Sequence, residues 1–336
     1  AAGYVWADGT VVTAGNQSYR KDGSTDIYDM PGWTWHGEET FWHHGGDYGD
    51  PNLPSSVSIR HVRDGTYVYD VIEIKNPRPQ TLRKEFAPGV AVDGVVDRIA
   101  VREYAQLNGY NAVINCDGWR NSDGTPGSDN VSARPMGLQI ADNTLYQDWL
   151  APETRDQAVV MTAQGRLVRA DKSGQTGAQW VAQNARWSAS WGVSVVEGGV
   201  AQNVDATYVT NAVSARIVLG QKLNGDLVII MIEGISFSYG ASGTQAGVIA
   251  QALGCEIAYL LDGGGSAQAW WHDCYAMPSS DDAFESERDV PTFLVIDAPV
   301  PEYDTGWITV PAAGGMTAQI AGWPICSVRQ RGAQVN

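Results

Sequence analysis

The chain has 336 residues, of which 43% are hydrophobic and 18% are charged, and its formal net charge is −16. This composition supports a sizeable core and argues against a disordered chain. The acidic balance disfavours binding to nucleic acid or anionic membranes, and without an apolar run of about 18 residues we expect no membrane insertion.

Residues 1–54 are rich in turns and aromatic side chains, and we interpret them as an N-terminal extension without persistent helix or strand periodicity. Two strands, 57–61 and 67–74, then flank an Asp-Gly hairpin signal. A helix is predicted across 96–107 because its apolar residues share one face, with Gly109 as its stop.

A short strand at 112–114 leads into a polar loop, residues 117–130. A second helix is predicted from Thr244, as N-cap, to Gly254. The other predicted elements are all strands, at 158–161, 167–169, 204–210, 214–219, 227–232, 257–261 and 292–296.

Residues 299–336 are punctuated by Gly and Pro and are interpreted as a C-terminal extension. The pattern predicts an α+β fold, in which mixed, mostly antiparallel twisted sheets are flanked by a few helices. One main domain, residues 55–298, is expected to lie between the two extensions.

The clearest chemical signal is a glycine-rich loop that follows a buried strand. It comprises Asp262, Gly263, Gly264, Gly265 and Ser266. Three glycines allow backbone conformations closed to other residues, so successive amides can form an anion-binding concavity beside a carboxylate. A sharp turn that merely needs glycine is the alternative interpretation.

Other polar residues lie at the ends of strands or within them. Glu233 ends the strand 227–232, and two carboxylates so placed suit acid–base or nucleophilic chemistry on a sugar. Arg216 lies within a strand, where a charge needs a partner or a cleft. Asn115 could bind sugar hydroxyls or form an Asx-turn, and Arg288 could bind phosphate or a surface carboxylate.

Metal and disulfide sites are weakly indicated. The acidic and amide residues Asp117, Asn121 and Asp123 suggest calcium but miss the EF-hand spacing, so no cofactor is required by the sequence. The histidines His36, His43 and His44 do not have zinc-site spacing. The four cysteines are Cys116, Cys255, Cys274 and Cys326, which allow three disulfide pairings or free buried thiols.

Several motifs in this order resemble the phosphodiester glycosidase family, over roughly residues 55–298. They are YVYDVIEIKNP, NAVINCDGW, SARIVLGQKLNGDLVIIMIEG, GTQAGVIAQALGCEIAYLLDGGGSAQ and ERDVPTFLVI. The resemblance implies site residues at Asn115, Arg216, Glu233, Gly243, Thr244, Asp262, Gly263, Gly264, Gly265, Ser266 and Arg288. Two departures stand out: Cys116 and Asp117 replace glycines of an Asn-Gly-Gly-aromatic motif, and Glu233 stands where Asp is more usual.

The resemblance implies hydrolysis of the bond between a sugar C1 atom and a phosphate oxygen, with Asp262 and Glu233 as catalytic residues and the arginines and loop amides holding phosphate. The expected partner is a phosphodiester-linked carbohydrate of a cell wall or cell surface. The alternatives are a non-catalytic carbohydrate-binding module or a structural tail module. With no visible signal peptide and irregular flanks, we expect an extracellular or virion-associated location, in a phage tail, another larger assembly or a homo-oligomer.

Overall fold

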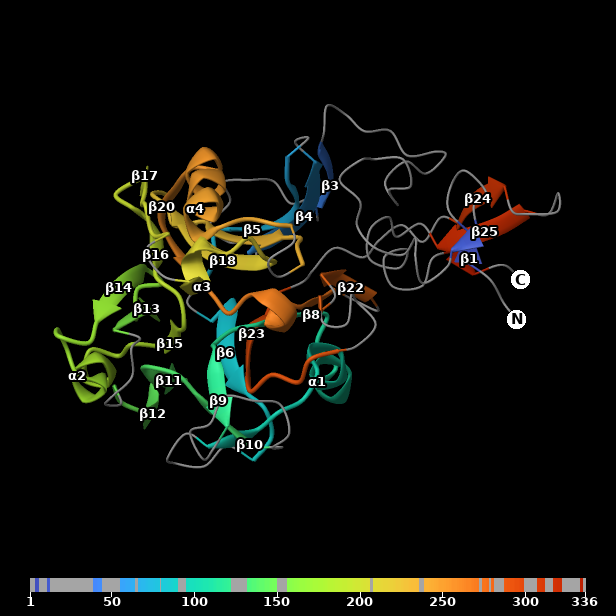
Figure 1. Ribbon diagram of the computed structural model, residues 1–336. Helices are drawn as coiled ribbons and strands as arrows, with labels where there is room; N and C mark the ends of the chain where they lie inside the picture. The colour runs from blue at the N-terminus through green and yellow to red at the C-terminus, as the bar shows by residue number, and fades with distance from the viewer. Residues whose placement is uncertain are drawn as a thin grey trace.

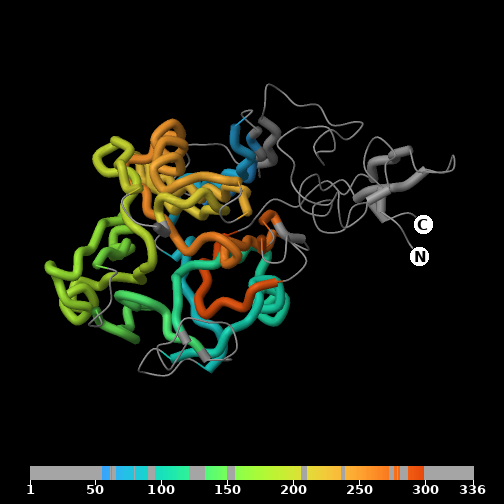
Figure 2. The backbone as a smooth tube through the Cα atoms, viewed as in Figure 1, coloured from blue at the N-terminus to red at the C-terminus, as the bar shows by residue number. Residues whose placement is uncertain are grey.

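The computed structural model describes most of the chain between residues 55 and 298. The described ranges are 55–63, 66–78, 80–89, 95–121, 132–149, 156–205, 208–235, 239–271, 274–277, 279–280 and 287–298, together with strands at 4–5, 11–12, 39–43, 307–311, 317–321 and 333–334. Figure 2 follows the backbone through these ranges. Among these residues, no helix has the length and apolar character needed to cross a membrane.

An eight-stranded sheet is the largest element of the fold (Figure 1), and every neighbouring pair in it is antiparallel. Its order is β17-β16-β20-β18-β19-β5-β4-β3. The strands are β3 (Glu39–His43), β4 (Ser56–Arg63), β5 (Val68–Lys75), β16 (Ser194–Glu197), β17 (Val200–Ala201), β18 (Arg216–Lys222), β19 (Leu227–Ile232) and β20 (Cys255–Leu260).

A second, five-stranded antiparallel sheet has the order β22-β21-β8-β23-β6. Its strands are β6 (Leu82–Phe86), β8 (Ala112–Asn115), β21 (Ala269–Trp271), β22 (Cys274–Met277) and β23 (Thr292–Ile296). The two sheets face each other across one apolar core, to which Ile217 and Ile229 contribute from the larger sheet and Ile114 and Trp271 from the smaller.

Side-chain alternation along the strands builds a layer on each outer face. Val218 and Ile230 of the larger sheet point away from the shared core and pack with helix α4 (Gly243–Ala252). Val113 of the smaller sheet packs with helix α1 (Val101–Asn108) in the same way. The order of layers is therefore helix, large sheet, small sheet, helix, which confirms the α+β class with mostly antiparallel sheets.

The remaining elements form small sheets and short helices. The strands are β1 (Tyr4–Val5), β2 (Val11–Val12), β7 (Val96–Asp97), β9 (Trp119–Asn121), β10 (Ser132–Pro135), β11 (Gln139–Ala141), β12 (Thr144–Gln147), β13 (Gln157–Met161), β14 (Leu167–Asp171), β15 (Trp187–Ser190), β24 (Trp307–Pro311), β25 (Thr317–Ala321) and β26 (Ala333–Gln334). The helices are α2 (Gly177–Ala182), α3 (Tyr208–Asn211) and the 3₁₀ turn η1 (Gly264–Ser266). A separate apolar cluster joins β11, β13 and β14.

Four sequence predictions about local structure are wrong. The polar loop predicted at 117–130 contains strand β9, which pairs with β10. The helix predicted across 96–107 begins only at Val101, because residues 96–97 pair with β10 and Ile99 bridges to Val290. The strand predicted at 204–210 is instead partly helix α3. The N-cap of α4 is Ser242, which forms a capping box with Gln245, rather than Thr244.

One strand of the predicted N-terminal extension belongs to a sheet of the main domain. Strand β3 lies within residues 1–54, yet it pairs with β4 along five residues, from Glu39↔Val62 to His43↔Ser58. The sequence predicted no strand in this extension, but residues 39–43 form one. The three-part division of the chain otherwise stays a prediction.

Helix α4 approaches the large sheet closely at Gly247, where an added Cβ would lie 2.5 Å from the carbonyl oxygen of Val195. We expect Gly247→Ala to lower the free energy of unfolding by about 1–3 kcal/mol, because backbone must move to relieve this contact. The exposed Val248 of the same helix provides the control, and Val248→Ala should change stability by no more than about 0.5 kcal/mol. Equal effects in urea unfolding would contradict the close approach.

Candidate active site

The topology of the large sheet brings three of the predicted site residues to one edge. Strand β18 is antiparallel to both β19 and β20, so β19 and β20 run parallel and end on the same side. Glu233 follows β19, Asp262 follows β20 and Arg216 begins β18 at this edge. Asn115, the last residue of β8 in the smaller sheet, reaches the same place, because its side-chain amide donates to the Asp262 carbonyl oxygen at 3.1 Å.

The carboxyl group of Asp262 is almost fully buried, with 6% of the residue exposed. Burial, which disfavours the charged form, raises its pKa to about 6, and the nearby Asp117 charge adds to the rise. Hydrogen bonds from Ser266 and the Gly263 amide, and the charge of Arg288, oppose it. A carboxyl group that changes protonation near neutral pH is suited to proton transfer and is common at reaction sites.

The glycine loop turns sharply beneath this carboxyl group. Gly264 has a φ of +61°, in the left-handed region that favours glycine. A Cβ at Gly263 would lie 2.8 Å from the carbonyl oxygen of Ala215, which confirms the need for glycine there as well. The Gly265 carbonyl oxygen accepts a hydrogen bond of 2.6 Å from the Ser279 hydroxyl.

Three amides of the glycine loop, which the sequence suggested as an anion cradle, donate hydrogen bonds within the protein. The Gly263 amide donates to Asp262 Oδ1 at 3.0 Å, the Gly264 amide to the Ala215 carbonyl oxygen at 2.9 Å, and the Ser266 amide to the Gly263 carbonyl oxygen at 3.2 Å. Three of the amides expected to hold phosphate are thus used within the protein. The loop instead fixes the Asp262 carboxylate and the Ser266 hydroxyl.

Arg216 is a buried cation beside Asp262. Its Nε donates to the Ala241 carbonyl oxygen at 3.0 Å and its Nη2 to the Ala212 carbonyl oxygen at 2.5 Å. Burial lowers the pKa of the guanidinium, whereas the charges of Asp262 and Asp205 raise it. The sequence predicted that a charge within this strand needs a partner or a cleft. Arg216 has such partners, and it places a positive charge beside Asp262.

Arg288 approaches the site from the segment before β23 and is half-buried. Its Nη1 lies 3.3 Å from the Ser266 hydroxyl oxygen, and its positive charge lowers the pKa of Asp262. Its backbone carbonyl oxygen accepts a 2.7 Å hydrogen bond from Gln268. Arg288 is therefore a partner of the glycine loop rather than only a member of a surface ion pair.

Glu233 is also buried, with 2% of the residue exposed. Its amide donates to the Val68 carbonyl oxygen at 2.9 Å, and the Tyr239 hydroxyl lies 3.3 Å from its Oε2. It does not face bulk solvent as a simple strand-ending acid would. Its carboxylate is held by a tyrosine that sequence reasoning did not single out.

Asn115 has a positioning role in this structure. It is fully buried, its Oδ1 accepts from the Gln268 amide at 2.9 Å, and its Nδ2 donates to the Asp262 carbonyl oxygen. Both ends of the side-chain amide thus bind the backbone on either side of the glycine loop. The predicted contact with sugar hydroxyls stays a prediction.

The first turn of α4 is occupied by a carboxylate of the protein itself. Asp205 Oδ1 accepts from the Thr244 amide at 3.0 Å, and Asp205 Oδ2 accepts from the Ser242 hydroxyl at 2.8 Å. The Thr244 hydroxyl accepts from the Val204 amide at 3.0 Å, and Gly243 packs against Val204. The first turn of α4 therefore binds Asp205, which lies within the segment wrongly predicted to be a strand. The site role that the resemblance implies for Gly243 and Thr244 stays a prediction.

Asp117, considered as a calcium ligand, instead forms a buried ion pair. Its Oδ2 lies 2.7 Å from Lys84 Nζ, and neither side chain is exposed. Asp117 Oδ1 also accepts from the Ser190 amide at 2.5 Å, and Lys84 Nζ also donates to the Ser188 carbonyl oxygen at 2.6 Å. The side chain of Asn121 and all of Asp123 lie outside the described residues. Within the described parts of the chain, no cluster of three His, Cys, Asp or Glu residues could hold a metal ion.

Two of the four cysteines are free buried thiols, Cys116 and Cys255. Burial raises the pKa of Cys116 well above its usual value and that of Cys255 to about 12, so both stay protonated at neutral pH. The side chain of Cys274 and all of Cys326 lie outside the described residues, as do His36, His44 and the side chain of His43. The free-thiol interpretation is confirmed for Cys116 and Cys255.

Removing one partner of the Lys84–Asp117 pair should strongly destabilise the fold. We expect Lys84→Met to lower the free energy of unfolding by about 3–5 kcal/mol, because the buried carboxylate is left without its counter-charge. Arg102 offers a matched control, since its ion pair with Glu287 is 41% and 32% exposed. Arg102→Met should cost no more than about 1 kcal/mol. Similar losses for both variants in urea unfolding would show that the pair is not buried as described.

The raised pKa of Asp262 predicts a specific pH dependence of stability. The folded chain retains this proton up to about pH 6, whereas the unfolded chain releases it near the ordinary value of 3.8. The unfolding free energy of the wild type should therefore fall, relative to Asp262→Asn, by roughly 1–3 kcal/mol as the pH rises from 4 to 7. A difference between the two proteins that stays constant over this range would contradict the shifted pKa.

Comparison with known proteins identifies the family. The phosphodiester glycosidase family matches residues 108–297, which is more than half of the chain. A relative from Bacillus subtilis (strain 168), the SPbeta prophage-derived uncharacterized protein YomE, is 28% identical over 241 residues. This match covers 70% of the chain but only 35% of the relative, so the chain spans about a third of that protein's length.

The fold matches a solved structure as well. The catalytic domain of zebrafish N-acetylglucosamine-1-phosphodiester alpha-N-acetylglucosaminidase, auto-inhibited by its pro-peptide, superimposes with a TM-score of 0.56 at 18% identity. The match covers 77% of the chain and 88% of the zebrafish domain. This likeness shows a shared fold. With more than half of its length matched, the chain belongs to the phosphodiester glycosidase family.

Proposed function

We propose that the chain is a hydrolase that cleaves the bond between a sugar C1 atom and a phosphate oxygen in a sugar-1-phosphodiester, with Asp262 as its central catalytic residue. The observation that carries this proposal is the buried carboxyl group of Asp262, with a pKa raised to about 6 and with Arg216 and Arg288 nearby. Such a site combines a reactive carboxylate with positive charge for a phosphate leaving group.

The leaving group determines which form of Asp262 acts. A phosphate ester departs from C1 without strong help from a general acid, so a protonated carboxyl group at that oxygen is not needed. Asp262 therefore acts as the carboxylate, either as a nucleophile at C1 or as the base for the attacking water. In either case the reaction breaks the C1–O bond, and the phosphate leaves with both bonding electrons.

Other residues near the reaction centre act on charge and position. Arg216 and Arg288 hold the phosphate and offset the negative charge that grows on it. Glu233, held by Tyr239, is the second carboxylate, available as base or nucleophile in the step that Asp262 does not perform. Asn115 acts through the backbone on both sides of the glycine loop, and is therefore a positioning residue.

The natural substrate is proposed to be a phosphodiester-linked glycopolymer of a cell wall or cell surface, encountered by an extracellular or phage-tail protein. Two observations support this setting: a prophage-derived relative and an acidic chain with a net charge of −16, which suits a protein that must not adhere to anionic surfaces at random. No cofactor enters the proposed reaction.

A non-catalytic carbohydrate-binding module is the second candidate. It is favoured by one observation, the internal use of the Gly263, Gly264 and Ser266 amides, which leaves the loop with fewer groups for a developing anion. Binding without turnover, unaffected by changes at Asp262, is the result that this candidate predicts.

The activity can be tested by hydrolysis of UDP-GlcNAc. We expect Asp262→Asn to reduce kcat by about 10²–10⁴-fold or more, because the isosteric amide can neither attack C1 nor accept a proton. The wild-type kcat/KM should rise with pH through about 6, since the carboxylate is the active form. Asp156, an exposed acid, gives the control Asp156→Asn, which should behave as wild type. Full activity in Asp262→Asn would remove Asp262 from the mechanism.

A further inference from the structure

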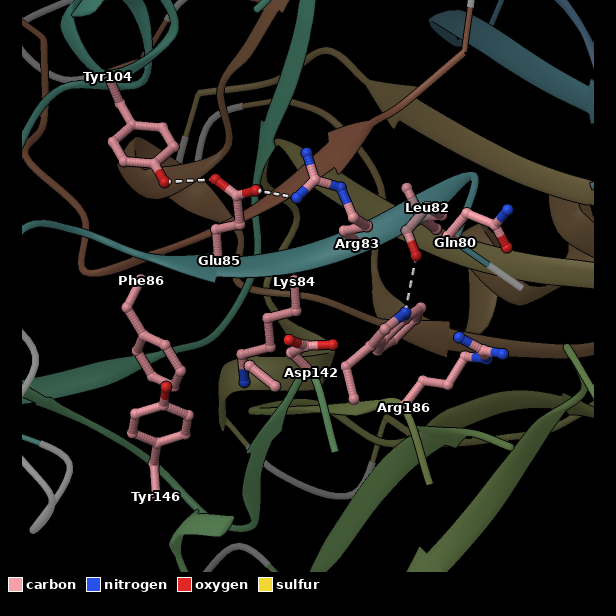
Figure 3. Close-up of a pocket in the computed structure, with 12 residues that line it drawn as sticks. Gln80, Leu82, Arg83, Lys84, Glu85, Phe86, Tyr104, Asp142, Tyr146 and Arg186 are labelled. Atoms are coloured by element: carbon pink, nitrogen blue, oxygen red, sulfur yellow. Dashed lines mark hydrogen bonds and ion pairs between the residues drawn. The ribbon is translucent and has the colours of Figure 1, made fainter. Parts of the chain in front are cut away.

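A cleft of about 400 Å³ lies along β6, and Figure 3 shows the side chains around it. Its walls come from β6, from the hairpin of β11 and β12, and from Arg186 and Trp187 at the start of β15. None of the residues assigned to the candidate active site lines it. Its volume falls in the range of small-molecule binding sites, and the proposed reaction does not use it.

One wall of the cleft is an edge of the smaller sheet, where no other strand of the described residues pairs with β6. β6 is the last strand of the smaller sheet, next to β23. Thr81 and Ala87, which flank β6, form backbone hydrogen bonds with the residues that flank β23, and every second residue between them points the same way. The Leu82 carbonyl oxygen points the other way and accepts a 2.8 Å hydrogen bond from Trp187 Nε1. Alternation therefore places the peptide groups of Lys84 on this edge, facing the cleft.

Aromatic side chains form another wall. The rings of Phe86 and Tyr146 lie 4.7 Å apart between centroids, at an angle of 46°, and both residues are half-buried. Figure 3 shows Phe86 above Tyr146 at one end of the cleft, with Lys84 and the turn residue Asp142 to their right. An aromatic pair with a hydroxyl group at its tip offers an apolar face and a polar contact to the same ligand.

The cations in the cleft differ in whether they form ion pairs with carboxylates of the described residues. Arg83 pairs with Glu85 at 2.7 Å and with Asp297 at 3.1 Å, and Lys84 pairs with Asp117. For Arg186, the only hydrogen bond to the side chain among the described residues joins Nε to the Ala163 carbonyl oxygen at 3.4 Å. Its terminal nitrogens are left to bind an anion, in a chain whose net charge is −16.

We propose that this cleft is a second carbohydrate subsite, which binds a sugar-phosphate unit of the polymer away from the bond being cleaved. The sugar ring packs on the pair formed by Phe86 and Tyr146, its hydroxyl groups bind the Tyr146 hydroxyl and the Lys84 peptide, and its phosphate binds Arg186. This inference rests on the proposed function for the identity of the polymer. The subsite would favour long substrates, since it adds contacts that a single sugar nucleotide at Asp262 does not make.

The same edge is too short to bind a polypeptide as an added strand. Trp187 already occupies the Leu82 carbonyl oxygen, and the aromatic pair lies at the Phe86 end. Only the peptide groups around Lys84 remain between them, whereas strand addition uses a row of several main-chain hydrogen bonds. A compact ligand with hydroxyl groups fits this space better.

Binding can be measured separately from turnover. In an Asp262→Asn background, calorimetry with poly(N-acetylglucosamine 1-phosphate) as the probe compares Tyr146→Ala and Arg186→Met with the surface variant Arg102→Met. We expect each cleft variant to weaken polymer binding about 10-fold and Arg102→Met to leave it unchanged. Tyr146→Phe keeps the ring, so it should recover most of the affinity lost in Tyr146→Ala, provided that all variants keep the wild-type thermal unfolding.

The hydrolysis arm uses chains with Asp262 intact. Tyr146→Ala and Arg186→Met should leave kcat/KM for UDP-GlcNAc within about twofold of wild type, because separate sites act independently, but should raise KM for the polymer. The subsite is overturned if both cleft variants bind the polymer as well as Arg102→Met, or if the parent chain does not bind it. Cleft-dependent binding without hydrolysis of either substrate would instead refute the proposed function and leave the subsite standing.

Discussion

Asp262 lies where the two sheets meet, and residues at the end of β8 in the smaller sheet bind both of its backbone polar groups. Its amide donates to the carbonyl oxygen of Cys116, which follows β8 of the smaller sheet, and its carbonyl oxygen accepts from Asn115. The residue itself leaves β20 of the larger sheet. Burial at this junction raises the pKa of the carboxyl group. The packing of the two sheets therefore determines at which pH Asp262 gains or loses its proton.

The Lys84–Asp117 pair shows how the fold accommodates an aspartate at a position where the resemblance to the family leads us to expect glycine. Asp117 stands where a glycine is expected, and a buried carboxylate there would be costly by itself. Lys84 from β6 supplies the counter-charge at 2.7 Å, and backbone groups at Ser188 and Ser190 complete the hydrogen bonding. The change of residue is thus accommodated within the fold, and it adds a negative charge that raises the pKa of Asp262 further.

Sequence patterns predicted the central strands well, because continuous apolar runs mark strands that are buried on both faces. The strands at 227–232 and 292–296 are confirmed as β19 and β23 with the same bounds. Prediction failed where tertiary contacts decide the conformation: residues 96–97 pair with β10 although their apolar spacing suggests a helix. Residues 204–210 are apolar enough for a strand, yet Asp205 is held by the first turn of α4.

The sequence indicated which carboxylates gather at the candidate site, but not the hydrogen bonds that its residues form. Strand ends indicated Asp262 and Glu233, because the residues after buried strands meet at one edge of a sheet. Sequence does not reveal which amides a loop uses internally, and the amides of Gly263, Gly264 and Ser266 donate within the protein. The role of residues 263–266 in binding phosphate stays a prediction. Lys84 and Tyr239 carried no signal, since each meets its partner only through the tertiary fold.

The most direct test of the central claim is the position of the bond that breaks. Hydrolysis of UDP-GlcNAc in ¹⁸O-labelled water, followed by mass spectrometry of the released UDP, distinguishes attack at the sugar C1 atom from attack at phosphorus. A glycosidase breaks the C1–O bond, so the account predicts UDP without label. One ¹⁸O atom in the terminal phosphate of the product would show cleavage of the P–O bond and would contradict it.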